Sequence, residues 1–145
     1  MSINTTLKTF NMMKKFFPLI VLFTILCSPL SVWAQSFIVT NVEFGPSYTE
    51  EMQDYVLKKD LGTQIDLQFF DNKVKIIMWD DGRETFDLYN KINSTKYEIN
   101  FDDLRYKINY SAVLELNTII SYIRSFTLTT YQNGKLQTKI TAKRK

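Results

Sequence analysis

The residues that can do chemistry in this chain are mainly carboxylates and aromatic rings. Its 145 residues include no histidine and one cysteine, Cys27. Most zinc and copper sites, and the Ser-His and Cys-His nucleophile pairs, need those two residue types. No G-x-G-x-x-G or G-x-x-x-x-G-K-[ST] segment occurs, which argues against nucleotide chemistry. We therefore expect no cofactor and no metal site, and we expect the protein not to be an enzyme.

Paired carboxylates are the one remaining route to acid–base catalysis, since glycoside hydrolysis needs only two of them at a fixed separation. The candidates are Asp66, Asp80, Asp81, Glu84, Asp102 and Asp103. Turn chemistry already explains Asp80-Asp81-Gly82 and Asp102-Asp103, because aspartate bonds its own backbone in turns. A carboxylate-based glycoside hydrolase is thus the third of three functional hypotheses.

Aromatic side chains supply the other candidate site. Such residues usually pack in a core, but in a barrel of about eight strands they can also line a cavity for one small apolar ligand. Tyrosine hydroxyls would orient that ligand. The candidate ligand-binding residues are Phe69, Phe86, Tyr97, Phe101, Tyr106, Tyr110 and Phe126.

The N-terminal segment is typical of a secretory signal peptide. Lys14 and Lys15 precede the apolar run 16–27, and small residues then lead to a cleavage site between Ala34 and Gln35. An uncleaved anchor and a lipoprotein modified at Cys27 are the alternatives, but prolines interrupt the run and Leu26 precedes the cysteine. We predict residues 1–34 to be the signal peptide and 35–145 to be a single exported domain, periplasmic or extracellular. Met12 and Met13 are alternative start sites.

Charge argues against nucleic acid as a partner. Three of the eighteen basic residues lie in the leader, which leaves the mature part with fifteen basic and fifteen acidic residues. The clustered positive charge of a nucleic-acid surface is missing. A basic tail of Lys139, Lys143, Arg144 and Lys145 is interpreted as a solvated chain end, with contact to anionic lipid or an envelope polymer as the alternative. The membrane is otherwise expected only through the signal peptide.

The first third of the mature part predicts a strand followed by a helix. Alternating apolar residues over 36–44 indicate the strand, which Gly45-Pro46 ends. Ser47 to Glu50 has the spacing of a capping box. The helix should present Tyr48, Met52, Tyr55 and Val56 on one face and end at Gly62.

From Gln64 onward the apolar period changes to two, which predicts an antiparallel meander. Turns are expected at 71–72, 80–82, 93–94, 102–103 and 133–134, and the last of these is Asn-Gly, the strongest hairpin signal in the chain. Residues 104–110 should form a strand. Residues 111–120 fit either a helix or a strand, because their apolar spacing is helical while their β-branched content favours a strand.

In pattern the chain is similar to small calycin/lipocalin-like barrels, which are secreted antiparallel meanders with aromatic inward faces. The Gly-x-Trp signature of those families has no counterpart, because Trp33 lies in the leader and Trp79 in a late strand. The order of elements also resembles cystatin-like α+β folds. We predict a mainly β fold, a small barrel or strongly curved sheet with one N-terminal helix, and the cystatin-like helix on an antiparallel sheet is the alternative.

These two architectures imply different partners. A barrel binds a small molecule inside, whereas an open sheet over a helix more often presents an edge to another protein. The first hypothesis is therefore a non-enzymatic exported binding protein that holds a small apolar ligand. The second is a protein-interaction or inhibitor module that contacts an envelope protein.

Overall fold

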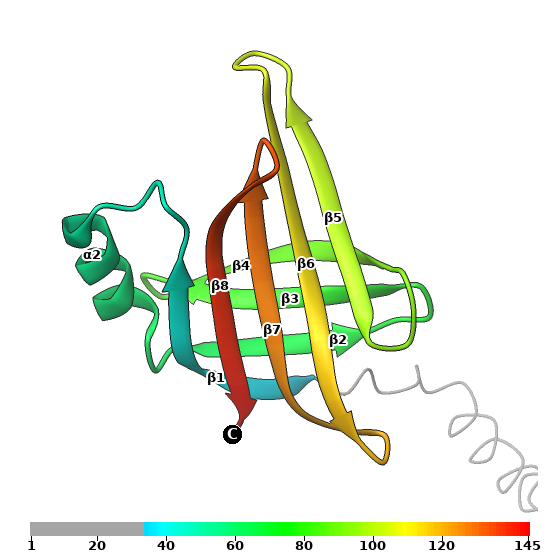
Figure 1. Cartoon of the computed structure of the whole chain (residues 1–145). Helices are drawn as coiled ribbons and strands as arrows, with labels where there is room; N and C mark the ends of the chain where they lie inside the picture. The colour runs from blue at the N-terminus through cyan, green and yellow to red at the C-terminus, as the bar shows by residue number, and fades with distance from the viewer. Residues whose placement is uncertain (1–33) are drawn as a thin grey trace, which may run out of the picture. The chain divides into compact units, whose positions relative to one another are not determined.

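The computed structural model describes residues 34–145, which form eight antiparallel strands and one helix (Figure 1). The predicted signal peptide lies outside the described residues, except for Ala34 at its cleavage site. The elements are β1 (Gln35–Phe44), α2 (Glu50–Asp60), β2 (Gln64–Phe69), β3 (Lys73–Asp80), β4 (Arg83–Lys91), β5 (Lys96–Asp103), β6 (Ile108–Ile119), β7 (Tyr122–Gln132) and β8 (Lys135–Arg144). The described residues contain no helix with the length and apolarity needed to cross a membrane.

The strands close into a barrel in the order β1 to β8. Each strand pairs with its neighbours in sequence, and β1 also pairs with β8, with Phe37 opposite Arg144 and Phe44 opposite Thr138. The predicted mainly β barrel with one helix is therefore confirmed. The cystatin-like open sheet is wrong, because pairing between the first and last strands leaves no open sheet for a helix to cover.

A bend in β1 joins two groups of strands that cross each other in Figure 1, β2–β4 and β5–β8. Residues 35–38 pair with β2, and the pairing with β8 shifts register between Val39 and Asn41. Beyond this irregularity β1 continues along β8 alone. Such a bulge bends and twists the strand locally, which allows β1 to take part in both groups of strands.

Between β4 and β5 the barrel is closed by a short stretch of pairing, which we call the seam. Only Asn90 with Glu98 and Lys91 with Tyr97 are paired there. Among the described residues, 83–89 pair with β3 alone and 99–103 with β6 alone. The two strands therefore diverge from this seam and leave two free edges.

Side chains fill the centre of the barrel. The six largest fully buried ones are Phe37, Phe126, Leu67, Ile76, Leu114 and Val74, and the described core contains no buried polar side chain. All core residues lie between Phe37 and Ala142. The described part thus has a hydrophobic core and a closed sheet, two features of domains that fold alone.

Helix α2 covers the side of the barrel where β1 has left β2. Thr49 caps it by accepting a hydrogen bond from the Met52 amide at 3.3 Å. The capping box predicted at Ser47 is wrong, because Ser47 belongs to the preceding turn and its hydroxyl donates to Gln137 instead. The expected apolar face is also displaced: Val56 packs against the core together with Leu57, whereas Met52 and Tyr55 are exposed.

The structure moves the predicted β5–β6 turn and resolves the ambiguous segment 111–120. The turn expected at 102–103 lies at 104–107, because the stacked rings of Phe101 and Tyr110 and a 2.8 Å hydrogen bond from Asn109 to Asp102 extend the β5–β6 ladder. The strand predicted over 104–110 therefore begins only at Ile108. The ambiguous segment 111–120 is a strand as far as Ile119.

Gly45 lies where the end of β1 passes the start of β8. Its amide donates to the Gln137 carbonyl at 2.7 Å, and a Cβ at this position would collide with the Leu136 carbonyl oxygen. We predict that Gly45→Ala lowers the free energy of unfolding by about 2 to 4 kcal/mol, because the backbone at position 45 must move away from that of Leu136 to make room for the Cβ. Urea titration would measure the change.

The matched control is Gly82→Ala, which puts a Cβ into open space but at a φ of +75°. Its expected cost is about 1 kcal/mol, from the left-handed backbone alone. Equal costs for the two variants would contradict the close approach at Gly45.

Candidate functional site

The predicted aromatic residues do not line one cavity of the described residues. Phe126 lies at the barrel centre, where its ring meets that of Phe37 edge to face, with centroids 5.0 Å apart. Phe101 and Tyr110 stack with centroids 5.0 Å apart on the projecting β5–β6 hairpin, and Tyr106 is exposed in its turn.

Phe86 lies on the outer surface of the barrel. It is opposite Ile77 on β3, and it lies three residues from the inward-facing Tyr89, so it has the opposite orientation. The Lys75 ammonium group lies 4.2 Å from the centroid of its ring. Together with Trp79 and Leu88, Phe86 forms what we call the outer patch, which lies over the nearly buried Ile77.

Phe69 and Tyr97 do lie together, with ring centroids 6.0 Å apart. They line a pocket of about 370 Å³ with hydroxyl groups at its rim, here called the Tyr97 pocket, whose walls include Phe69, Thr95, Tyr97, Leu116, Ser121 and Ile123. Burial raises the pKa of the Tyr97 hydroxyl above its ordinary value. This pocket lies between the start of β5 and the β6–β7 turn.

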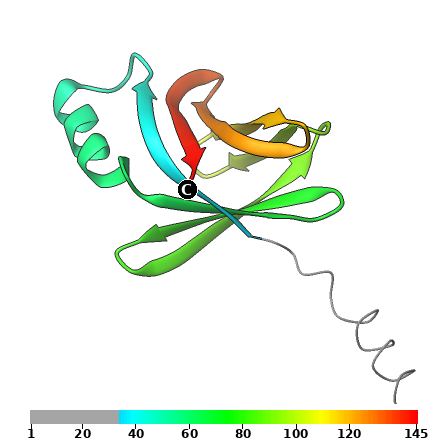
Figure 2. The same cartoon turned by 90° about the horizontal axis from the view of Figure 1, so that it is seen from below.

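The larger described pocket, about 410 Å³, lies beside the helix. It is enclosed by the end of α2, the start of β2 and the β3–β4 hairpin, and Figure 2 shows α2 and this hairpin on the same side of the barrel. We call it the helix-side pocket. Its volume is in the range of small-molecule sites.

The helix-side pocket combines an apolar floor with an acidic rim. The floor includes Val39, Ile65, Met78 and Ile140, Trp79 also lines the pocket, and the rim carries Lys59, Asp60, Asp80 and Asp81. Three carboxylates against one ammonium group leave an excess of negative charge, which suits a ligand with an apolar body and a cationic group.

The chain folds locally so that these carboxylates converge. Asp60 is the last residue of α2, and its backbone carbonyl accepts hydrogen bonds from the amide and hydroxyl of Thr63, which begins the path into β2. Asp81 and Gly82 both have positive φ, as a type I′ turn requires, and this places Asp80 and Asp81 at the tip of the β3–β4 hairpin.

An ion pair spans the pocket rim. The Lys59 Nζ lies 3.1 Å from the Asp80 Oδ1, and both side chains are about half exposed, at 47% and 50%. The hydrogen bond and charge of Asp80 raise the pKa of Lys59. This pair links the helix to the hairpin without burying either charge.

Asp60 is the carboxylate whose environment differs most from water. Burial is the largest cause that raises its pKa, the nearby Lys59 opposes the shift, and the charge of Asp80 adds to it. Sequence reasoning did not select Asp60. A signal was available, because an acidic residue at a helix C-terminus faces the negative end of the helix dipole and is unfavourable there.

The other candidate carboxylates have local structural partners. Asp66 accepts from Gln64, Glu84 pairs with Lys75, Asp102 accepts from Asn109, and Asp103 accepts from the amides of Arg105 and Tyr106. Of the six, only Asp80 and Asp81 line the helix-side pocket. Within residues 34–145 no cluster of three or more potential metal ligands is found.

Comparison with known proteins adds no relative: no protein-family model matches the chain, and no curated protein matches it. The site must therefore be interpreted from its own geometry.

The raised pKa of Asp60 predicts a pH-dependent effect of Asp60→Asn. A carboxyl whose pKa is higher in the folded state destabilises the fold once pH rises through its ordinary value of 3.8, and this penalty is complete at neutral pH. The amide carries no such penalty. We expect Asp60→Asn to be more stable than wild type toward urea at pH 7, and this advantage to shrink as pH falls through the raised folded-state pKa and to disappear below the ordinary value of 3.8.

Asp54→Asn, on an exposed part of the same helix, is the control and should show no such pH-dependent difference. If Asp60→Asn proved less stable than wild type at pH 7, the carboxylate would have a stabilising partner and this description of its environment would be wrong.

Proposed function

We propose that this chain is an exported, non-enzymatic binding protein that holds a small amphiphilic cation in the helix-side pocket. The observation that carries the proposal is the combination of an apolar floor and an excess of carboxylates in one pocket of about 410 Å³. The leader sequence is the basis for export. The proposal changes the ligand first expected, a wholly apolar molecule, because the barrel centre is occupied by side chains.

Each part of the pocket has a distinct task in this proposal. Met78 and Ile140 pack against the apolar body of the ligand, where burial contributes roughly 25 cal/mol per Å² of apolar surface removed from water. Asp60 and Asp81 accept hydrogen bonds from its cationic group. The pair of Lys59 and Asp80 closes the rim, and its exposure allows it to open for entry.

Octylammonium is a suitable probe, because it has one apolar chain and one cationic group. We predict that the described domain binds it in calorimetric titrations, and that Asp60→Asn and Asp81→Asn each weaken binding about fivefold, the equivalent of roughly 1 kcal/mol. Octanol, which lacks the charge, should bind equally to wild type and both variants.

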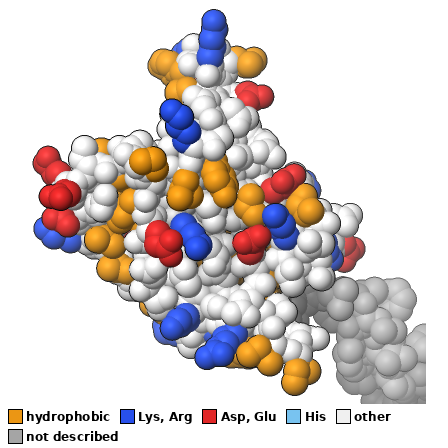
Figure 3. All heavy atoms as spheres, viewed as in Figure 1, with side chains coloured by type: hydrophobic (Ala, Val, Ile, Leu, Met, Phe, Trp, Pro, Cys, Tyr) orange, Lys and Arg blue, Asp and Glu red, His pale blue; other side chains and the backbone are white. Residues whose placement is uncertain are grey.

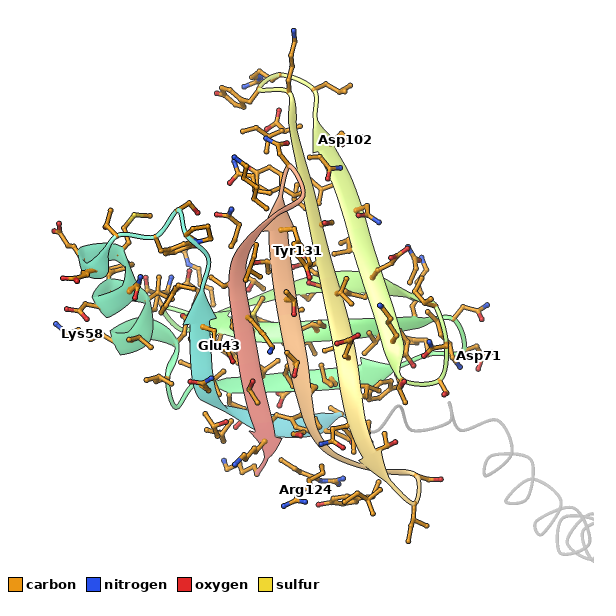
Figure 4. All side chains as sticks on the ribbon, in the orientation of Figure 1. Glu43, Lys58, Asp71, Asp102, Arg124 and Tyr131 are labelled. Carbon is orange, nitrogen blue, oxygen red and sulfur yellow. The ribbon has the colours of Figure 1, made fainter. Side chains whose placement is uncertain are left out.

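The matched control is Asp71→Asn, since Figure 4 shows Asp71 on the side of the barrel away from α2. This variant should bind octylammonium as wild type does. Binding that is unchanged in Asp60→Asn and Asp81→Asn, or no binding at all, would refute the assignment of the helix-side pocket.

A second candidate function is recognition of another protein, and the outer patch favours it. Trp79 and Phe86 are each more than half exposed on the outer face of β3–β4, next to the free edge of β4. Apolar side chains beside an unpaired edge are what strand addition by a peptide uses. In that case Phe86→Ser with Leu88→Ser would abolish partner capture and leave octylammonium binding intact, since neither residue lines the helix-side pocket.

A further inference from the structure

The β6–β7 hairpin ends in apolar side chains that face solvent. Ile120 is 97% exposed, and Ile119 and Tyr122 on either side of the turn are about half exposed. We call residues Ile119–Tyr122 the hairpin tip. Apolar side chains exposed at the end of a projecting element are available for contact with a surface outside the protein.

The backbone of the hairpin tip is strained. Ile120 has a φ of +48° and Ser121 one of +64°, so the turn has the conformation that glycine and asparagine adopt most easily. Two other turns of this chain have the same signs of φ and use suitable residues, Asp81-Gly82 and Asn133-Gly134. A β-branched residue in this conformation is a conformational outlier, and such strain is concentrated at functional sites.

Basic side chains lie near the hairpin tip and at the adjoining end of β8. The guanidinium carbon of Arg144 lies 4.3 Å from the centroid of the Tyr122 ring, Lys143 is opposite Ser125, and Arg124 follows Ile123 directly. We call this group the basic collar: Arg124, Lys143, Arg144 and Lys145. Segments 116–125 and 142–145 contain no acidic residue. Figure 4 shows Arg124 at the same end of the barrel as the C-terminus.

The opposite end of the molecule provides a comparison. The β5–β6 turn also exposes apolar residues, Leu104 and Tyr106, but Asp102 and Asp103 there balance Arg105 and Lys107. Figure 3 shows Lys and Arg side chains near hydrophobic ones at the lower end of the face in view. An apolar tip therefore occurs at the β6–β7 end together with an excess of positive charge, in which the four basic residues face one acidic residue, Asp66, on the adjoining β2.

We propose that the hairpin tip inserts into the interface of an anionic lipid bilayer, with the basic collar bound to the lipid headgroups. Ile120 supplies the apolar group, Tyr122 has the amphipathic ring favoured at headgroup depth, and each cation near an anionic surface adds attraction. The inference goes beyond the proposed ligand binding and does not depend on it.

The path of the chain agrees with this orientation. The Lys145 amide donates to the Ser36 carbonyl at 3.1 Å, so the described domain begins beside the basic collar. The first strand of the described domain therefore begins at the end of the barrel that carries the hairpin tip. The helix-side pocket, bordered by α2 and the β3–β4 hairpin, would remain open to solvent.

Vesicle sedimentation tests the proposal. The described domain, which has its own hydrophobic core, is mixed with vesicles of phosphatidylcholine alone or with about one third phosphatidylglycerol. We expect binding to the anionic vesicles that weakens as salt is raised, since salt screens the basic collar. Ile120→Asp should reduce this binding about tenfold or more, because a carboxylate opposes both insertion and the anionic surface.

Leu104→Asp is the matched control, with the same change at the other exposed turn, and should bind as wild type. Replacing Ile120-Ser121 by Asn-Gly distinguishes a loss of stability from a loss of membrane contact, because Asn-Gly removes the backbone strain of the turn together with the apolar side chain. The melting temperature of this variant should rise while its vesicle binding falls. Equal losses in Ile120→Asp and Leu104→Asp, or wild-type binding in both, would overturn the proposal. So would lipid-independent self-association that Ile120→Asp abolishes, which would identify a second copy of the chain as the partner.

Discussion

Contact between Phe37 on β1 and Phe126 on β7 determines where this barrel can bind anything. The two rings meet edge to face across the interior, and both are almost completely buried. Leu67, Ile76 and Leu114 fill the space around them. Protein interiors are packed about as densely as organic crystals, so a centre filled in this way has no room for a ligand. Binding is thereby restricted to the ends and the outer surface of the barrel.

Three features outside the filled centre provide the surfaces that remain. The bend in β1 takes its second half away from β2, and α2 covers the resulting gap, so that a pocket forms where the helix meets the β3–β4 hairpin. The β4–β5 seam is short, which leaves Phe101 and Tyr110 on a projecting hairpin rather than over the core. At the β6–β7 end, the strained hairpin tip and the basic collar form a surface of different chemistry.

The sequence predicted the parts of this structure that depend on local chemistry. Alternating apolar residues and the turns at Asp81-Gly82 and Asn133-Gly134 identified most strands correctly, because side-chain period and turn type are local properties. The turn at Ile120-Ser121 was missed, since neither residue favours positive φ and tertiary pairing imposes it. The helix-side pocket was not predictable, because Val39, Asp60, Met78 and Ile140 are brought together only by closure of the barrel. Alternation places Phe86 and Tyr89 on opposite faces but does not say which face is inward.

The middle of the barrel is filled, and the candidate binding sites lie at its ends and on its outer surface. Crystals of the described domain pressurised with xenon test this most directly, because xenon enters dry apolar cavities. We predict no xenon among Phe37, Leu67 and Leu114 in the wild type, and one bound atom there in Phe126→Ala, which should be less stable by about 3 to 5 kcal/mol. Xenon at the centre of the wild-type barrel would contradict the account, because the interior would then have room for an apolar ligand.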